Sequence, residues 1–153
     1  MIKYILPLFA FILIFAACEK ETDYAAVDDA AIIKYLADSN LTDEATKTAS
    51  GLYYIIENPG TGDHPVTTSM VHVYYKGYLL DGTVFDQTKN NIYARFYLNQ
   101  VIKGWEEGLM LFGKGGKGKL LIPSDLAYGA TAKSSIPAHL VLIFDIELLD
   151  IYN

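Results

Sequence analysis

The chain has 153 residues, of which 52% are hydrophobic, and a formal net charge of −6. This length allows one ordinary domain with a short extension, and the apolar content excludes a disordered chain. The acidic balance argues against a nucleic-acid partner, because phosphate backbones are bound by positively charged surfaces. The single cysteine, Cys18, excludes an internal disulfide.

The N-terminus has the pattern of an export signal. Lys3 precedes an apolar run at residues 5–17, which is short for a membrane span. Residues 15–18, Phe-Ala-Ala-Cys, resemble a bacterial lipobox, although Phe15 stands where a leucine-like residue is usual. We therefore expect a signal peptide at residues 1–17 and lipidation of Cys18. An uncleaved anchor, or an ordinary signal with an incidental cysteine, is the alternative.

A lipid-anchored protein of this kind would lie in the bacterial cell envelope, facing the periplasm or the cell surface. It would contact the membrane through the anchor only, since several acyl chains suffice for stable anchoring. The sequence does not distinguish inner from outer membrane.

Residues 19–50 follow as a polar tether and a helical extension. A weak apolar stripe predicts a helix over residues 25–39. Residues 40–50 are polar and rich in threonine, so a second short helix and a loop are both compatible with them. The predicted helix could act as a spacer or as a dimerisation element, and the oligomeric state stays open.

From Gly51 onward the hydrophobic period changes from helical to two, which predicts β-strands. Strands are expected near residues 52–56, 71–76, 84–86, 96–98, 120–122 and 140–148, with turns at 58–62 and 80–83. The last of these strands has the clearest alternation in the chain and is predicted to be half-buried.

One short helix interrupts the strands. Trp105, Leu109 and Phe112 recur at i, i+4 and i+7, and Gly113 suits a C-terminal stop. Laid across a sheet, this helix would present the indole as the floor of a cavity. Several strands with one packed helix predict an α+β fold.

Six segments between residues 51 and 150 share the order and spacing of one known family. They are Tyr75-Lys76-Gly77, Asp81-Gly82-Thr83-Val84-Phe85-Asp86, Val101-Ile102-Lys103-Gly104-Trp105, Ile122-Pro123, Leu126-Ala127-Tyr128-Gly129 and Phe144-Asp145-Ile146-Glu147-Leu148. Together they closely resemble the core of FKBP-type peptidyl-prolyl isomerases. The resemblance implies a twisted, half-open antiparallel sheet wrapped around one short α-helix, here with a small helical N-terminal extension. The isomerase domain would span residues 51–153, after a tether and extension at 18–50.

The resemblance also implies an activity, acceleration of X-Pro isomerisation in proline-containing polypeptides. The barrier, about 18–20 kcal/mol, arises because twisting the amide breaks its resonance. An apolar cavity tolerates the less charge-separated twisted amide better, relative to water, than it tolerates the planar one. Differential binding then suffices, so no metal, cofactor or nucleophile is expected.

The resemblance assigns a role to each matching position. Residues that would bind substrate are Tyr75, Phe85, Val101, Ile102, Trp105, Ile136 and Phe144. Trp105 would underlie the proline ring, the Ile102 N–H would bind a substrate carbonyl, and Ile136 would cover the bound segment. As catalytic residues, Tyr128 would donate its hydroxyl to the amide carbonyl, and Asp86 would polarise or orient the peptide from the rim. Taken singly, each could instead be an ordinary core or turn residue.

Three departures from the family pattern concern the rim of this pocket. Ala94 stands where an aromatic residue is usual, residues 130–136 form a shorter loop, and Ala138 replaces a proline. They bear on sequence preference and on affinity for macrolide inhibitors more than on the fold. Ala94 and the altered loop also support an alternative function, a non-catalytic chaperone or interaction module of the same fold.

Two further patterns are weak. Residues 113–119 nearly match a phosphate-binding loop, but Leu120 stands where a magnesium-binding Ser or Thr is needed and a strand is expected next. His64, His72 and His139 lack metal-ligand spacing and are expected at the surface.

Overall fold

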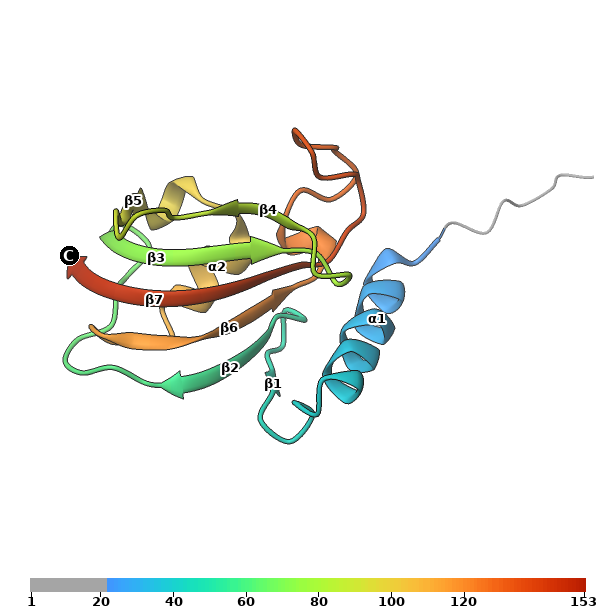
Figure 1. The fold of residues 1–153 in the computed structure, drawn as a ribbon, viewed down its shortest axis with the longest axis horizontal. Coiled ribbons are helices and arrows are strands. Elements are labelled where there is room, and N and C mark those ends of the chain that lie inside the picture. The colour runs from blue at the N-terminus through green and yellow to red at the C-terminus, as the bar shows by residue number, and fades with distance from the viewer. Residues whose placement is uncertain (1–21) are drawn as a thin grey trace, which may run out of the picture.

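A computed structural model describes residues 22–153, in which seven antiparallel strands form one sheet (Figure 1). The strands are ordered β1-β2-β6-β7-β3-β4, and β5 also pairs with β3. The elements in chain order are α1 (Tyr24–Asp38), β1 (Thr46–Lys47), β2 (Tyr53–Asn58), β3 (Met70–Tyr78), β4 (Val84–Gln87), β5 (Ala94–Tyr97), η1 (Leu98–Gln100), α2 (Lys103–Leu109), β6 (Gly116–Ile122), η2 (Ser124–Leu126) and β7 (Leu142–Tyr152). The α+β architecture predicted from the sequence is therefore observed.

Helix α2 packs on the inner face of the sheet and closes the main hydrophobic core. It begins at Lys103 and ends at Leu109, so it starts earlier and stops earlier than the sequence predicts. Phe112 is nevertheless fully buried, because a turn continues from the helix and the Phe112 N–H bonds the Leu109 carbonyl at 3.2 Å. Gly113 then donates to the Pro59 carbonyl at 2.8 Å, which ties the end of this turn to the β2–β3 connection.

Helix α1 packs on the opposite face at one end of the sheet, as Figure 1 shows. Its Ile32 and Leu36 join a second cluster with side chains of β2, β6 and β7, among them Leu121 and Ile143. This end of the sheet is therefore buried on both faces. The prediction of a half-buried last strand is wrong at Ile143, which is fully buried because α1 covers it.

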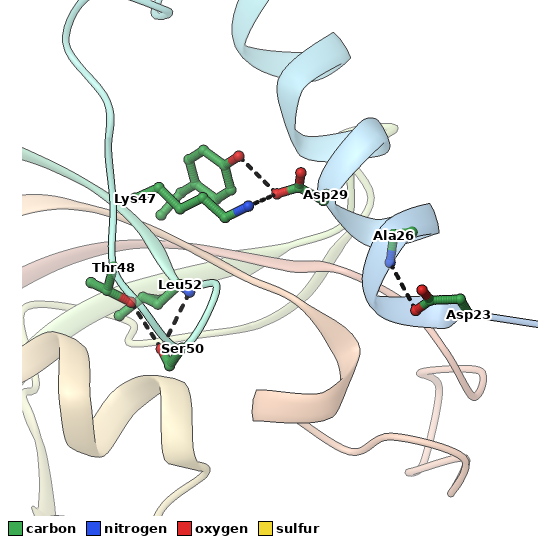
Figure 2. A network of polar contacts seen from close by, with 8 residues as sticks. Asp23, Ala26, Asp29, Lys47, Thr48, Ser50 and Leu52 are labelled. Atoms are coloured by element: carbon green, nitrogen blue, oxygen red, sulfur yellow. Dashed lines mark hydrogen bonds and ion pairs between the residues drawn. The ribbon is translucent and has the colours of Figure 1, made fainter.

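Polar contacts fix α1 at its start and at its middle (Figure 2). Asp23 caps the helix by accepting a hydrogen bond from the Ala26 N–H at 3.2 Å. Asp29 accepts a hydrogen bond from the Tyr53 hydroxyl at 2.8 Å and pairs with Lys47. The bond from Lys47 is the main reason why the pKa of Asp29 is lowered.

The connection between α1 and β2 contains turns and the short strand β1, with no second helix. Strand β1 pairs with β2, Thr46 lying opposite Tyr54 and Lys47 opposite Tyr53. The glycine- and lysine-rich segment at 113–119 includes the first half of β6, which lies between β2 and β7, so the segment opens no helix.

The histidines differ partly from the expectation. His64 is exposed, but His72 is only 8% exposed, because its ring lies between Tyr93 and Tyr152 at centroid distances of 4.4 and 4.9 Å. His139 is half-buried. Within residues 22–153, no group of three or more His, Cys, Asp or Glu side chains could hold a metal ion.

The signal peptide at residues 1–17 and the lipidation of Cys18 lie outside the described residues. Among residues 22–153, no helix is both long and apolar enough to cross a membrane.

Replacing Ile32 by alanine tests the packing of α1. Ile32 is fully buried, whereas Ile33 on the same helix is 50% exposed. Ile32→Ala should lower the free energy of unfolding by about 2–5 kcal/mol, through lost burial and the cavity left behind. Urea unfolding of the full chain measures this, with Ile33→Ala as the control that should change stability by only about 0.5 kcal/mol. Equal effects of the two substitutions would contradict the packing of α1 described here.

Candidate functional site

An open cavity of ≈ 630 Å³ lies where the inner face of the sheet meets α2 and two loops. Its lining comprises Tyr75, Phe85, Asp86, Phe96, Gln100, Val101, Ile102, Trp105, Tyr128, Lys133, Ser134, Ser135, Ile136 and Phe144. All the substrate-binding and catalytic positions predicted from the sequence occur in this lining, although their functional roles stay predictions. The fold thus brings together side chains from β3, β4, α2 and β7 and from the loop before β7.

Trp105 forms the floor of the cavity. The indole is only 4% exposed, and three rings meet it edge to face: Tyr75 at 5.2 Å, Phe96 at 5.3 Å and Phe144 at 5.1 Å between centroids. Such T-shaped contacts are the favoured geometry of aromatic pairs. Its Nε1 is buried and has no hydrogen-bond partner within residues 22–153. The rings brace one another, so the floor is rigid and almost wholly apolar.

A glycine on β3 makes room for the side wall. The rings of Phe85 and Phe144 pack edge to face at 5.5 Å, directly over Gly77. A Cβ at Gly77 would lie 2.6 Å from Phe85 Cε2 and 2.8 Å from Phe144 Cε1, which is closer than atoms approach in proteins. The wall therefore requires glycine at this position, a steric role that the sequence did not reveal.

A phenol–carboxylate pair lies at the rim. The hydroxyl of Tyr75 donates to Asp86 Oδ2 at 2.6 Å, and Asp86 Oδ1 accepts from the Gln87 N–H at 2.9 Å. The pKa of Tyr75 is raised well above its usual value, first by burial and then by the hydrogen bond to Asp86, with a further contribution from Tyr128. Tyr75 therefore stays protonated across the physiological range and holds the exposed Asp86 carboxylate in place.

The entry to α2 presents a backbone donor. Ile102 is the N-cap residue with extended backbone angles, and its carbonyl accepts from the N–H groups of Trp105 and Glu106, both at 3.0 Å. Its own N–H makes no hydrogen bond with any other described residue. Because Val101 and Ile102 both line the cavity, this N–H is available to a ligand.

The loop between η2 and β7 covers one side of the cavity. Lys133 and Ile136 exchange backbone hydrogen bonds at 2.9 and 2.8 Å, which makes a tight hairpin, and Ile136 is buried. Ser134 and Ser135 lie at the tip of this hairpin and also line the cavity. The sequence analysis assigned a covering role to Ile136 but did not identify Lys133, Ser134 and Ser135 as lining residues.

Sequence reasoning missed two other lining residues, Phe96 and Gln100. Phe96 lies on β5, and Leu98, two residues later at the start of η1, is fully buried. The predicted alternation of Phe96 and Leu98 could therefore have indicated that Phe96 points inward. No comparable pattern marks Gln100, because η1 is only a single turn.

Residues 62–149 match the family model described as FKBP-type peptidyl-prolyl cis-trans isomerase. The chain belongs to this FKBP family. It is 48% identical over 119 residues to FkpA of Aeromonas hydrophila, an alignment that covers 77% of this chain and 44% of the relative. It is 43% identical over 121 residues to the 22 kDa FKBP-type isomerase of Escherichia coli, covering 78% and 59%.

Solved FKBP structures confirm the fold expected from the sequence. The crystal structure of FkpA from Escherichia coli matches with a TM-score of 0.75 and 39% identity, covering 84% of this chain and 61% of that one. A peptidyl-prolyl cis-trans isomerase from Pseudomonas syringae matches with a TM-score of 0.72 and 32% identity, covering 88% and 99%. The chain spans about half the length of the curated FKBP relatives above.

The raised pKa of Tyr75 can be measured in this FKBP chain by NMR titration of ring-labelled tyrosine, with Tyr75→Phe assigning the signal. Asp86→Asn should lower the pKa of Tyr75, because its phenolate would then form beside a neutral amide and not beside a carboxylate. The pKa of Tyr75 should stay above its usual value, because the ring is still buried. Asp81→Asn is the control, since Asp81 bonds the Thr83 N–H and does not contact Tyr75. An unchanged Tyr75 titration in Asp86→Asn would contradict the pairing.

Proposed function

We propose that this chain is a peptidyl-prolyl cis-trans isomerase that accelerates X-Pro isomerisation in exported polypeptides. The observation that carries the proposal is the rigid aromatic cavity with its few polar groups at the edge. Apolar pockets with a small number of placed donors are typical binding sites for compact ligands, and a proline ring is such a ligand. The family relatives, which are named as isomerases, support the same activity.

The mechanism requires binding alone. The proline ring lies on Trp105, and the apolar walls favour the twisted amide over the planar one relative to water. The free N–H of Ile102 binds a substrate carbonyl, which holds the peptide in register. Tyr128 donates its hydroxyl to the carbonyl of the rotating amide as the C–N bond loses double-bond character. Because these contacts strengthen as the amide twists, they lower the barrier without a covalent step.

Asp86 has an orienting role in this scheme. Its carboxylate is held by Tyr75 at the rim, where it attracts the N–H groups of the peptide that flanks the proline. Ile136 covers the bound segment and reduces its contact with water.

The rim determines which sequences and inhibitors fit. Ala94 leaves space beside β5 where an aromatic ring is usual in the family, and Lys133 adds a cation at the mouth of the cavity. Macrolides that fill the cavity are expected to compete with proline peptides. Ala94 and Lys133 are expected to change the affinity of the chain for these macrolides.

The proposed location rests on the N-terminal sequence pattern. Acylation of Cys18 after removal of residues 1–17 would anchor the protein in the bacterial envelope and place the isomerase among proteins folding after export. The residues from Glu19 to the start of α1 at Tyr24 would act as a tether that separates the domain from the lipid surface. Protease treatment of intact cells distinguishes the two orientations, because only a domain at the cell surface would be cleaved.

A non-catalytic chaperone or interaction module of the same fold is the second candidate. Ala94 and the short loop carrying Lys133, Ser134 and Ser135 favour it, because they alter the rim that positions the peptide. Such a module would protect unfolded clients from aggregation but leave proline kinetics unchanged.

The deciding experiment is a proline-peptide assay with a cis-sensitive signal, run with and without a macrolide. The full chain should accelerate equilibration, and Tyr128→Phe should lower kcat/KM by about tenfold, which corresponds to the loss of one hydrogen bond worth about 1.4 kcal/mol. Tyr97→Phe, outside the cavity lining, is the control and should retain activity. A folded chain without acceleration would refute the isomerase, and full activity of Tyr128→Phe would refute the role of that hydroxyl.

Anchoring is tested in bacterial cells by labelling with a radioactive fatty acid and separating membranes from soluble protein. The natural chain should carry the label and sediment with membranes, because several acyl chains bind a bilayer stably. Cys18→Ser should lose the label and leave the membrane fraction. Unlabelled natural protein that still sediments would favour an uncleaved anchor.

A further inference from the structure

We propose that Asp28 of α1 is a positioning residue for Tyr128, so that the N-terminal extension is part of the isomerase machinery. The inference rests on the proposed function, in which the Tyr128 hydroxyl contacts substrate. It concerns a side chain outside the cavity lining and in a different element.

Asp28 is a buried carboxylate with a defined partner. It is 3% exposed, and its Oδ2 accepts two hydrogen bonds from Ser124, one from the backbone N–H at 2.7 Å and one from the hydroxyl at 2.6 Å. Ser124 is itself 1% exposed and is the first residue of η2. A buried carboxylate is unfavourable unless it is hydrogen-bonded, and bonds to a charged acceptor are stronger than neutral ones. The two elements are therefore held together at one defined point.

Ser124 in turn holds the backbone on both sides of Tyr128. Its carbonyl accepts hydrogen bonds from the Ala127 N–H at 2.9 Å and from the Gly129 N–H at 2.8 Å. Tyr128 is the residue between these two donors. A continuous series of hydrogen bonds thus runs from the Asp28 carboxylate through Ser124 to the peptide groups that set the direction of the Tyr128 side chain.

A second contact of α1 reaches the far end of the covering loop. Tyr24, the first residue of α1, stacks on His139 with a centroid distance of 3.5 Å and an interplanar angle of 9°. The backbone N–H of His139 donates to the Gly129 carbonyl at 2.8 Å, which closes the loop that carries Ile136. Helix α1 therefore contacts the chain on both sides of Tyr128: Asp28 bonds Ser124 before it, and Tyr24 stacks on His139 after it.

Asp28 is not needed simply to dock α1 on the sheet. The apolar side chains Ile32 and Leu36 already dock α1 on the sheet, and Asp29 adds its contacts to Lys47 and Tyr53 (Figure 2). A carboxylate aimed at Ser124 fixes the position of η2, because a hydrogen-bonded pair has a narrower geometry than an apolar contact. Misplacement of a catalytic group by about 1 Å can cost a reaction a hundredfold in rate, so a positioning contact of this kind has a measurable effect.

The test compares two neighbouring residues of α1 in the full chain. Asp28→Ala should lower kcat for a proline peptide by about three- to tenfold with little change in KM, because the apolar pocket that binds proline is intact. Asp29→Ala is the matched control, since it removes a polar contact of the same helix without touching Ser124, and it should keep the natural kcat. Asp28→Asn retains an oxygen acceptor for Ser124 and should recover much of the activity. Equal losses in Asp28→Ala and Asp29→Ala would overturn the proposal.

A double substitution separates positioning from general destabilisation. If Asp28 acts through the Tyr128 hydroxyl, adding Asp28→Ala to Tyr128→Phe should cause no further loss of kcat. A loss that multiplies with that of Tyr128→Phe would mean that Asp28 affects the domain in another way, and would refute the proposal.

Amide hydrogen exchange gives a readout that does not depend on activity. Asp28→Ala should increase the exchange rates of the Ala127 and Gly129 amides, while Asp29→Ala should leave both unchanged. Unchanged rates in Asp28→Ala would overturn the positioning role even in an active enzyme. If the natural chain proves inactive, the proposed function fails, and the exchange rates alone then decide whether Asp28 orders this segment.

Discussion

The close approach of α2 to the sheet is the constraint on which the cavity depends. A Cβ at Gly104 would overlap the side chain of Ile122, and one at Gly108 would lie 2.5 Å from Leu120 Cδ1. Two glycines one turn apart on the helix therefore allow its backbone to rest directly on β6. Because the helix lies so close, the Trp105 indole reaches the rings of the neighbouring strands instead of being held away from them. Larger side chains at these glycines would lift the floor and separate those rings.

The polar groups of the site lie around an apolar floor, and two of them have a defined environment. Tyr75 donates its hydroxyl to Asp86 and remains protonated, so it acts as a fixed part of the rim. The N–H of Ile102 is left free by the N-cap geometry of α2. This arrangement suits a reaction in which an amide loses charge separation, since an apolar floor and a small number of donors favour the twisted form without strong solvation of the planar one.

Much of this arrangement could be predicted from the sequence, because the inner face of the sheet follows a simple alternation. The sequence indicates the inward positions of the last strand and the apolar period around Trp105. It does not indicate the exact ends of α2, because the chain leaves the helix at Leu109 and a turn places Phe112 in the core. The roles assigned to Tyr128 and Ile102 came from family resemblance, not from periodicity.

The outer face was harder to predict. Nothing in the weak stripe of α1 indicates which surface it covers, and that choice depends on long-range packing. A signal was nevertheless present: at residues 120–122 and 142–144 three apolar residues follow one another, which is typical of strands buried on both faces. His72, expected at the surface, is likewise buried by long-range packing, because Tyr93 and Tyr152, both distant from it in sequence, enclose its ring.

The placement of α1 has a consequence for how the polypeptide acquires its native state. Asp28 and Ser124 are 96 residues apart, so their contact contributes strongly to the contact order, and domains of high contact order fold slowly. During synthesis α1 leaves the ribosome long before β6 and β7 exist, and a helix of 15 residues is marginal in water on its own. Helix α1 can therefore dock fully only after β6 and β7 have been made, although it is synthesised before them.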